Sequence, residues 1–150
     1  MVAKPAKDFM ITPLRLFLAF TLAFSWACSS DRDRVDYIPY VHVNEQINLT
    51  NVQYAALRQD RGFVCLNAGL RGIIVIRQSN NRYLAFEQNC PFQPYDSCAT
   101  VKVDASSLFL KDDCCGSQFD FTGAVIAGPA NLPLKQYATS LSGNLLYISN

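Results

Sequence analysis

The segment that carries most information about the fold reads Asp112-Asp-Cys-Cys-Gly-Ser-Gln-Phe-Asp120. It places two adjacent cysteines between a pair of carboxylates and a short alternating run. A second cysteine-bearing segment lies upstream and reads Asn89-Cys-Pro-Phe92, with Cys98 six residues beyond it. Four of the six cysteines of the chain therefore lie between residues 90 and 115. This clustering makes the region the candidate site.

Around these two segments, apolar residues occur in short alternating runs that end at turn residues, which predicts β-strands. Hairpins are predicted from four pairs of such runs: 73–76 with 83–86, 101–103 with 108–110, 119–121 with 124–126, and 137–141 with 145–148. Strands at this spacing, with almost no helical periodicity, predict an all-β sandwich or barrel.

The composition limits the possible functions. The 150 residues suffice for one ordinary domain, and 50% hydrophobic with 17% charged residues predict a folded chain. A net charge of +1 without a basic run gives no indication of nucleic-acid binding. His42 is the single histidine, so mechanisms that need two imidazoles are excluded. No catalytic triad, phosphate-binding loop or carboxylate pair is found, and we expect no enzymatic activity.

The N-terminus has the pattern of an export signal. Three basic residues, Lys4, Lys7 and Arg15, precede an apolar run over residues 16–27, which is short for a membrane span. The run ends at Cys28, and a charged stretch comes next. This arrangement resembles a bacterial lipobox, in which Cys28 is lipidated and becomes the first mature residue. The alternatives are a plain secretory signal and an uncleaved anchor helix.

These features predict three parts: a lipoprotein signal peptide over residues 1–27, a polar tether over 28–37, and a β domain over 38–150. The lipid on Cys28 would attach the domain to a membrane of the cell envelope, on the periplasmic face or at the cell surface. Export to an oxidising compartment also permits disulfides among the six cysteines.

The two cysteine-bearing segments, together with residues 116–137, resemble the Rieske [2Fe–2S] domain. The resemblance includes the Gly-Ser-x-Phe-Asp phrase at 116–120, Gly-Pro-Ala at 128–130 and Pro-Leu at 133–134. It implies small antiparallel sheets and a two-loop tip that binds the cluster in the family. Family members transfer electrons through that cluster.

The resemblance also assigns the four family ligand positions to Cys90, Phe92, Asp112 and Cys115. A Rieske centre needs two thiolates on one iron and two imidazoles on the other. Only Cys90 matches this pattern, since Phe92 and Cys115 stand at the two histidine positions and Asp112 at a cysteine position. We therefore expect a degenerate domain that binds no metal.

The resemblance further implies a disulfide between Cys98 and Cys114, because some family members carry an extra cysteine in each loop. It places Cys90 and Cys115 on facing loops, and we expect a second disulfide, Cys90–Cys115, in place of the cluster. The swapped pairing, Cys90–Cys114 with Cys98–Cys115, remains open. Cys65 is expected to be a buried thiol.

These residues favour a clusterless, disulfide-linked structural or binding module with an unknown protein partner and no cofactor. The alternative function is electron transfer by a non-standard [2Fe–2S] cluster on the four loop cysteines. A zinc site on the same four thiolates and thiol–disulfide exchange are two further alternatives. The pair Asp112 and Asp113 is expected to be a solvated turn rather than a calcium site.

Overall fold

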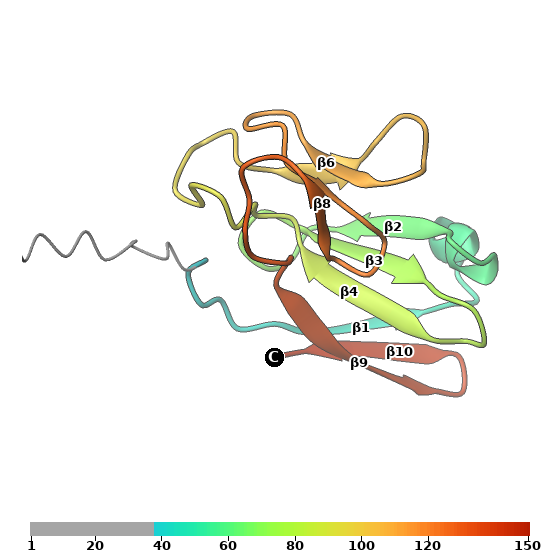
Figure 1. The fold of residues 1–150 in the computed structure, drawn as a ribbon. Helices are drawn as coiled ribbons and strands as arrows, with labels where there is room; N and C mark the ends of the chain where they lie inside the picture. Colours follow the sequence, from blue (N-terminus) through green and yellow to red (C-terminus); the bar gives the residue numbers. More distant parts are fainter. Residues whose placement is uncertain (1–37) are drawn as a thin grey trace, which may run out of the picture. The chain divides into compact units, whose positions relative to one another are not determined.

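The structure is a computed structural model that describes residues 38–150. In that range the chain forms ten strands and one short 3-10 helix, η1 (Val52–Arg58), as Figure 1 shows. The strands within each sheet pair in antiparallel fashion. The all-β fold class predicted from the sequence is confirmed. Within the described residues, no helix is long and apolar enough to cross a membrane.

The larger sheet has six strands in the order β1-β10-β9-β4-β3-β2. Their bounds are β1 (Asn44–Asn48), β10 (Leu145–Ser149), β9 (Gln136–Ser142), β4 (Tyr83–Glu87), β3 (Ile73–Arg77) and β2 (Phe63–Leu66). Two three-stranded halves meet where β4 pairs with β9 at only two positions, Ala85↔Tyr137 and Phe86↔Gln136. The chain leaves this sheet after β4 and returns to it at β9.

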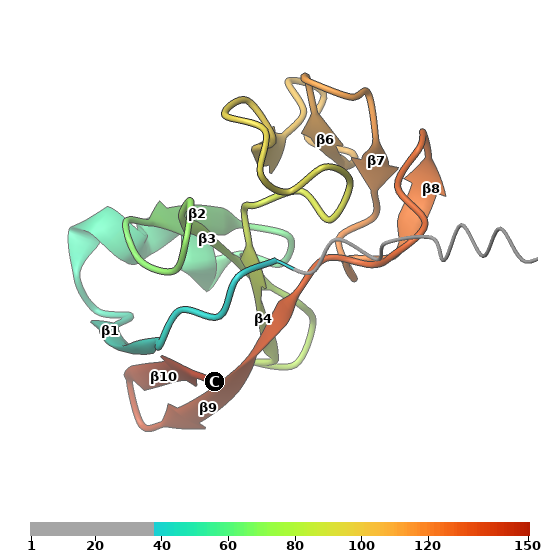
Figure 2. The ribbon, with the colours of Figure 1, turned by 90° about the vertical axis from the view of Figure 1, so that its left-hand side faces the viewer.

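The smaller sheet lies in the chain between these two strands. Its strands, in spatial and chain order, are β5 (Val101–Val103), β6 (Leu110–Asp112), β7 (Gln118–Phe119) and β8 (Val125–Ala127). Figures 1 and 2 show it on one side of the larger sheet. Both cysteine-bearing segments therefore belong to one inserted unit between β4 and β9.

Strand β3 is apolar over its first four residues because it is covered on both faces. Ile74 and Ile76 pack in a buried cluster with residues of the smaller sheet, among them Leu110 and Phe119. Ile73 and Val75 point the other way into a second cluster, which includes Leu57 of η1 and residues of β10. Side chains alternate between the faces of a strand, so one run of four apolar residues supplies both cores.

The predicted hairpins are present, with shifted ends in the smaller sheet. Strand β6 begins at Leu110 rather than Leu108, because residues 104–109 form a longer turn. The carboxylate of Asp104 accepts hydrogen bonds from the amide and hydroxyl of Ser106. The backbone amide of Asp104 donates to Phe109 O at 3.0 Å. No pattern in the sequence indicated η1, in which Leu57 is the only buried residue.

Candidate functional site

The first cysteine-bearing loop, residues 91–99, begins just after Cys90, which lies three residues beyond the end of β4 at Glu87. Cys90 has no exposed surface, and its amide donates to Ala99 O at 3.2 Å, which closes the base of the loop. Within the loop, the amides of Asp96 and Ala99 donate to Gln93 O and Asp96 O. These bonds make the loop a compact series of turns, with Cys98 at its exposed side.

The second loop, residues 113–117, connects β6 to β7 in a tight turn. Asp112 is fully buried at the end of β6, and its Oδ1 accepts a hydrogen bond from the amide of Cys114 at 2.8 Å. The amide of Gly116 donates to Asp112 O at 2.9 Å, and Gly116 adopts a φ of 79°, which favours glycine. The Asp-x-Cys-Cys-Gly sequence thus folds the turn around the Asp112 side chain. We call the two loops together the tip.

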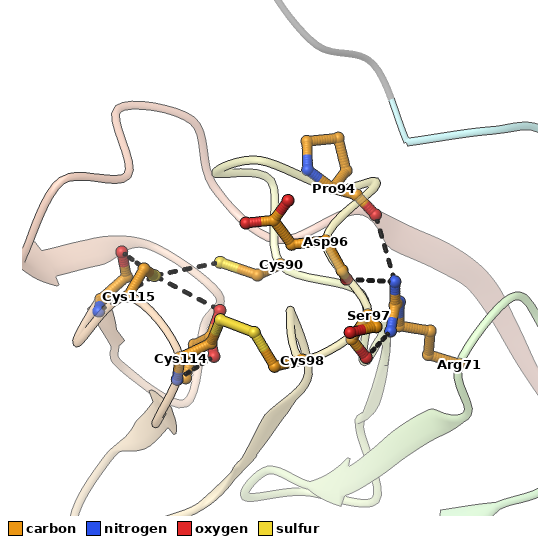
Figure 3. The surroundings of a disulfide bond; sticks show 10 residues. Arg71, Cys90, Pro94, Asp96, Ser97, Cys98, Cys114 and Cys115 are labelled. Atoms are coloured by element: carbon orange, nitrogen blue, oxygen red, sulfur yellow. Dashed lines mark hydrogen bonds between the residues drawn. A yellow bond between two sulfur atoms is a disulfide. The ribbon is translucent and has the colours of Figure 1, made fainter.

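A disulfide between Cys98 and Cys114 joins the two loops, with the Cα atoms 5.6 Å apart (Figure 3). This is the first of the two predicted disulfides, and it is confirmed. Arg71 holds the adjacent part of the first loop by donating to the carbonyl oxygens of Ser97, Asp96 and Pro94. The disulfide also excludes the swapped pairing, and it leaves two fewer thiols than the alternative four-cysteine metal sites require.

Cys90, Asp112 and Cys115 come together beside this disulfide. One ligand atom from each lies within 4.8 Å of the other two. The two sulfur atoms are 3.8 Å apart, and the Cys115 thiol lies 3.3 Å from Asp112 Oδ2 and 3.0 Å from Ser117 Oγ. The three residues occupy three of the four positions that the Rieske resemblance assigned to cluster ligands.

The predicted second disulfide, Cys90–Cys115, is not formed in the structure, where both residues are free thiols. A disulfide needs the sulfurs about 2.0 Å apart, well below the observed separation of 3.8 Å. The Cys115 thiol instead faces the Asp112 carboxylate and the Ser117 hydroxyl. These polar neighbours favour the thiol position seen in the structure.

The donor set does not fit a Rieske [2Fe–2S] cluster. Such a cluster needs two imidazoles, and the three residues offer two thiols and one carboxylate. Phe92, at the fourth position, packs against the apolar cluster beneath the tip and has no donor atom. His42 is an exposed residue just before β1 and is not part of the group.

The environment of Cys90 favours its protonated form. Burial, and then a hydrogen bond to Asp112, hold the pKa of the Cys90 thiol well above its usual value. A thiol with a raised pKa is a weak nucleophile, because the thiolate is the reactive species. This environment gives no support to the thiol–disulfide exchange considered from the sequence.

Glu87, at the end of β4, holds the backbone of residues that flank the first loop, and the sequence analysis did not identify it. It has no exposed surface, and its carboxylate accepts four hydrogen bonds. The donors are the amides of Leu70, Arg71 and Asn89, at 2.8, 2.9 and 3.1 Å, and the hydroxyl of Tyr137 at 2.7 Å. A glutamate between an apolar strand and a cysteine was the available signal, since such a residue needs partners when buried.

Two further expectations differ from the structure. Cys65, on the edge strand β2, is exposed rather than buried. The Asp112–Asp113 pair is not a solvated turn throughout: Asp113 is exposed and pairs with Lys111 at 3.0 Å, whereas Asp112 is buried. The adjacent carboxylates point to different environments, and only Asp112 belongs to the site.

The protein thus belongs to the class of small β domains in which two facing loops form a site at one end. Comparison with known proteins shows what this chain is similar to. A chain that is similar in sequence is the cytochrome b6-f complex iron-sulfur subunit of Chlorobaculum thiosulfatiphilum, with 38% identity over 52 residues. That match covers 35% of this chain and only 28% of the relative. No protein-family model matches the sequence.

Two solved structures are also similar. The ferredoxin of carbazole 1,9a-dioxygenase from Nocardioides aromaticivorans IC177 has a TM-score of 0.46 and 18% identity, over 73% of this chain and 97% of the ferredoxin. The plasma membrane Rieske protein PetC3 from Synechocystis PCC 6803 has a TM-score of 0.51 and 22% identity. That match covers 73% of this chain and 98% of PetC3. The likeness to PetC3 shows that the described residues form a Rieske-like domain, as the sequence motifs predicted.

Proposed function

We propose that this chain is a membrane-anchored Rieske-like module with a structural or binding role, and that it carries no [2Fe–2S] cluster. One observation supports the proposal most strongly: the tip offers two thiols and a carboxylate where a Rieske cluster needs two thiolates and two imidazoles. Phe92 fills the fourth position with an aromatic ring. Of the four ligands of a Rieske-type electron carrier, only Cys90 is kept.

The tip has another means of staying rigid without a cluster. The Cys98–Cys114 disulfide links the two loops, and Arg71, whose amide is held by Glu87, donates hydrogen bonds to carbonyl oxygens of the first loop. Disulfides are a common substitute for a large core in exported domains. A rigid tip of this kind suits a surface that presents fixed side chains to a partner.

Exposed apolar side chains beside the first loop support a binding role. Leu70 and Tyr95, with 38% and 70% of their surface exposed, line a hollow of about 350 Å³ together with Pro39, Arg71 and Pro94. Aromatic residues are enriched at protein interfaces. A protein partner that contacts the tip would cover this hollow.

The alternative function is electron transfer through a non-standard [2Fe–2S] cluster. Two observations favour it: the sequence similarity to an iron-sulfur subunit and the three clustered donors at the tip. It requires a cluster with a carboxylate ligand and no imidazole, although iron in such clusters is normally held by sulfur and nitrogen. The Cys98–Cys114 disulfide removes two of the four thiolates on which this alternative first relied.

The test is the iron and acid-labile sulfide content of the full chain, purified from its membrane without added metal. We expect less than about one iron per ten chains, no acid-labile sulfide and no visible absorption band. Two irons and two sulfides per chain, with a visible spectrum that dithionite bleaches, would overturn the proposal and establish the electron-transfer alternative.

A further inference from the structure

The three donors at the tip form a site that the Cys98–Cys114 disulfide does not explain. Cys90 and Asp112 have no exposed surface, and Cys115 is half-buried. Cys90 lies just before the first loop, and Asp112 and Cys115 lie at the second, yet their ligand atoms lie within 4.8 Å of one another. The Cys98–Cys114 disulfide already links the two loops, so it does not explain why these three side chains also lie together.

The distances match those of a tetrahedral metal site. With Zn–S bonds of about 2.3 Å and tetrahedral angles, two sulfur ligands lie about 3.8 Å apart. With a Zn–O bond of about 2.0 Å, a sulfur and an oxygen ligand lie about 3.5 Å apart. The observed separations are 3.8 Å between the sulfurs and 3.3 Å between Cys115 Sγ and Asp112 Oδ2.

The burial of the Asp112 carboxyl group also favours a bound metal ion. Neither ion pair found among residues 38–150 includes Asp112, since the nearby Lys111 pairs with Asp113. Asp112 Oδ1 accepts a hydrogen bond from the amide of Cys114, and Oδ2 accepts one from the Cys115 thiol, which is a weak and uncharged donor. Burying a carboxylate without a counter-ion is costly, and a bound cation removes that cost.

We propose that Cys90, Asp112 and Cys115 together bind one zinc ion at the tip. Two thiolates and a carboxylate are ligands that Zn²⁺ commonly takes, and three protein ligands leave the fourth position for water or for the buried hydroxyl of Ser117. Binding replaces the two thiol protons, which are released to solvent, and no electron is transferred. The ion would also protect the two thiols from oxidation in the envelope.

The first experiment adds Zn²⁺ or Co²⁺ to the full chain in detergent, after chelation, with the disulfide intact. We expect one ion per chain and an increased melting temperature. The cobalt form should show thiolate charge-transfer bands and the intense visible bands of a tetrahedral ion. X-ray absorption of the zinc form should give two sulfur ligands at about 2.3 Å with oxygen ligands completing the shell.

The second experiment assigns the ligands with single variants. Cys90→Ser, Asp112→Asn and Cys115→Ser should each weaken zinc binding by about 100-fold or more, since changes in outer-shell residues already cost about 10–100-fold. Cys65→Ser is the matched control, because Cys65 is also a free thiol but lies on β2. The control should bind zinc like the unmodified chain. If a ligand variant fails to fold, the X-ray absorption of the unmodified chain decides.

The outcomes separate this proposal from the proposed function. Absence of saturable zinc binding, a zinc shell without sulfur, or zinc binding that depends on Cys65 would overturn the zinc site and leave the clusterless module intact. Recovery of a Cys90–Cys115 disulfide from the natively purified protein would do the same. Stoichiometric iron with sulfide would overturn both.

Discussion

At the scale of single residues, the hydrogen bond between Tyr137 and Glu87 stabilises the structure next to the tip. The Tyr137 hydroxyl is one of four donors to the buried Glu87 carboxylate, whose acceptor sites are thereby filled. Burial, and then the hydrogen bond to Glu87, raise the pKa of Tyr137, so the hydroxyl remains a donor at neutral pH. We predict that Tyr137→Phe lowers the free energy of unfolding by about 1.5–3 kcal/mol.

Urea denaturation of the purified domain measures this loss. Tyr147→Phe is the control, because Tyr147 is 38% exposed on β10, and its change should stay within about 0.5 kcal/mol. Equal stability of the two variants would show that the Glu87 network is not an anchor of the tip.

Asp120 predicts a pH dependence at the turn between β7 and β8. Its Oδ1 accepts hydrogen bonds from the amide and hydroxyl of Thr122 and the amide of Ala124, at 2.8, 2.6 and 3.0 Å. Partial burial acts to raise the pKa of Asp120, but these hydrogen bonds outweigh it and leave the pKa below its usual value. A lowered folded pKa contributes stability above the unfolded pKa of about 3.9, which is lost as the pH falls through the folded value.

We therefore predict that Asp120→Asn costs about 1 kcal/mol of unfolding free energy at pH 7, and less as the pH falls below about 4. Denaturation at neutral pH and at about pH 3 measures both values. Asp113→Asn serves as the control, because its exposed ion pair with Lys111 contributes little. A cost for Asp120→Asn that is the same at both pH values would contradict the role of the charge.

At the scale of elements, the Cys98–Cys114 disulfide joins two loops at positions 16 residues apart in sequence. Cross-linking positions at this separation stabilises a domain by about 3 kcal/mol, mainly by restricting the unfolded chain. The double variant Cys98→Ala/Cys114→Ala should lose about this amount in urea denaturation, whereas Cys65→Ala should lose little. Equal stability of the double variant and the unmodified domain would show that the bond is not a structural one.

The sequence predicted those elements whose signal is local. The runs 73–76 and 83–86 are apolar enough to mark β3 and β4. The Rieske-like pattern implied the Cys98–Cys114 bond but left the swapped pairing open, and the structure decides between them. The state of Cys90 and Cys115 was not predictable, because it depends on Asp112 and Ser117 turning their polar groups toward the sulfur. η1 and the exposure of Cys65 depend on neighbours distant in sequence, and no local pattern encodes those.

At the scale of the whole molecule, the net charge of the chain bears on the proposed attachment to a membrane. Removal of residues 1–27 would leave ten basic and eleven acidic side chains, a net charge of −1. Such a chain has no polybasic segment to attract it to anionic lipids. The apolar run over 16–27 and Cys28, which lie outside the described residues, are then the features expected to hold the protein at a membrane.

The last prediction concerns this attachment. The full chain, made in a bacterial host that processes lipoproteins, should sediment with membranes, resist extraction by about 1 M salt and dissolve in detergent, because acyl chains rather than charges would hold it. Mass spectrometry should find a diacylated or triacylated Cys28 as the first residue. Cys28→Ser should abolish the acylation and either release the domain or leave the leader uncleaved, whereas Cys65→Ser should change neither. An intact Met1 end on the unmodified chain, or an unacylated Cys28, would show that the N-terminus is not a lipoprotein signal.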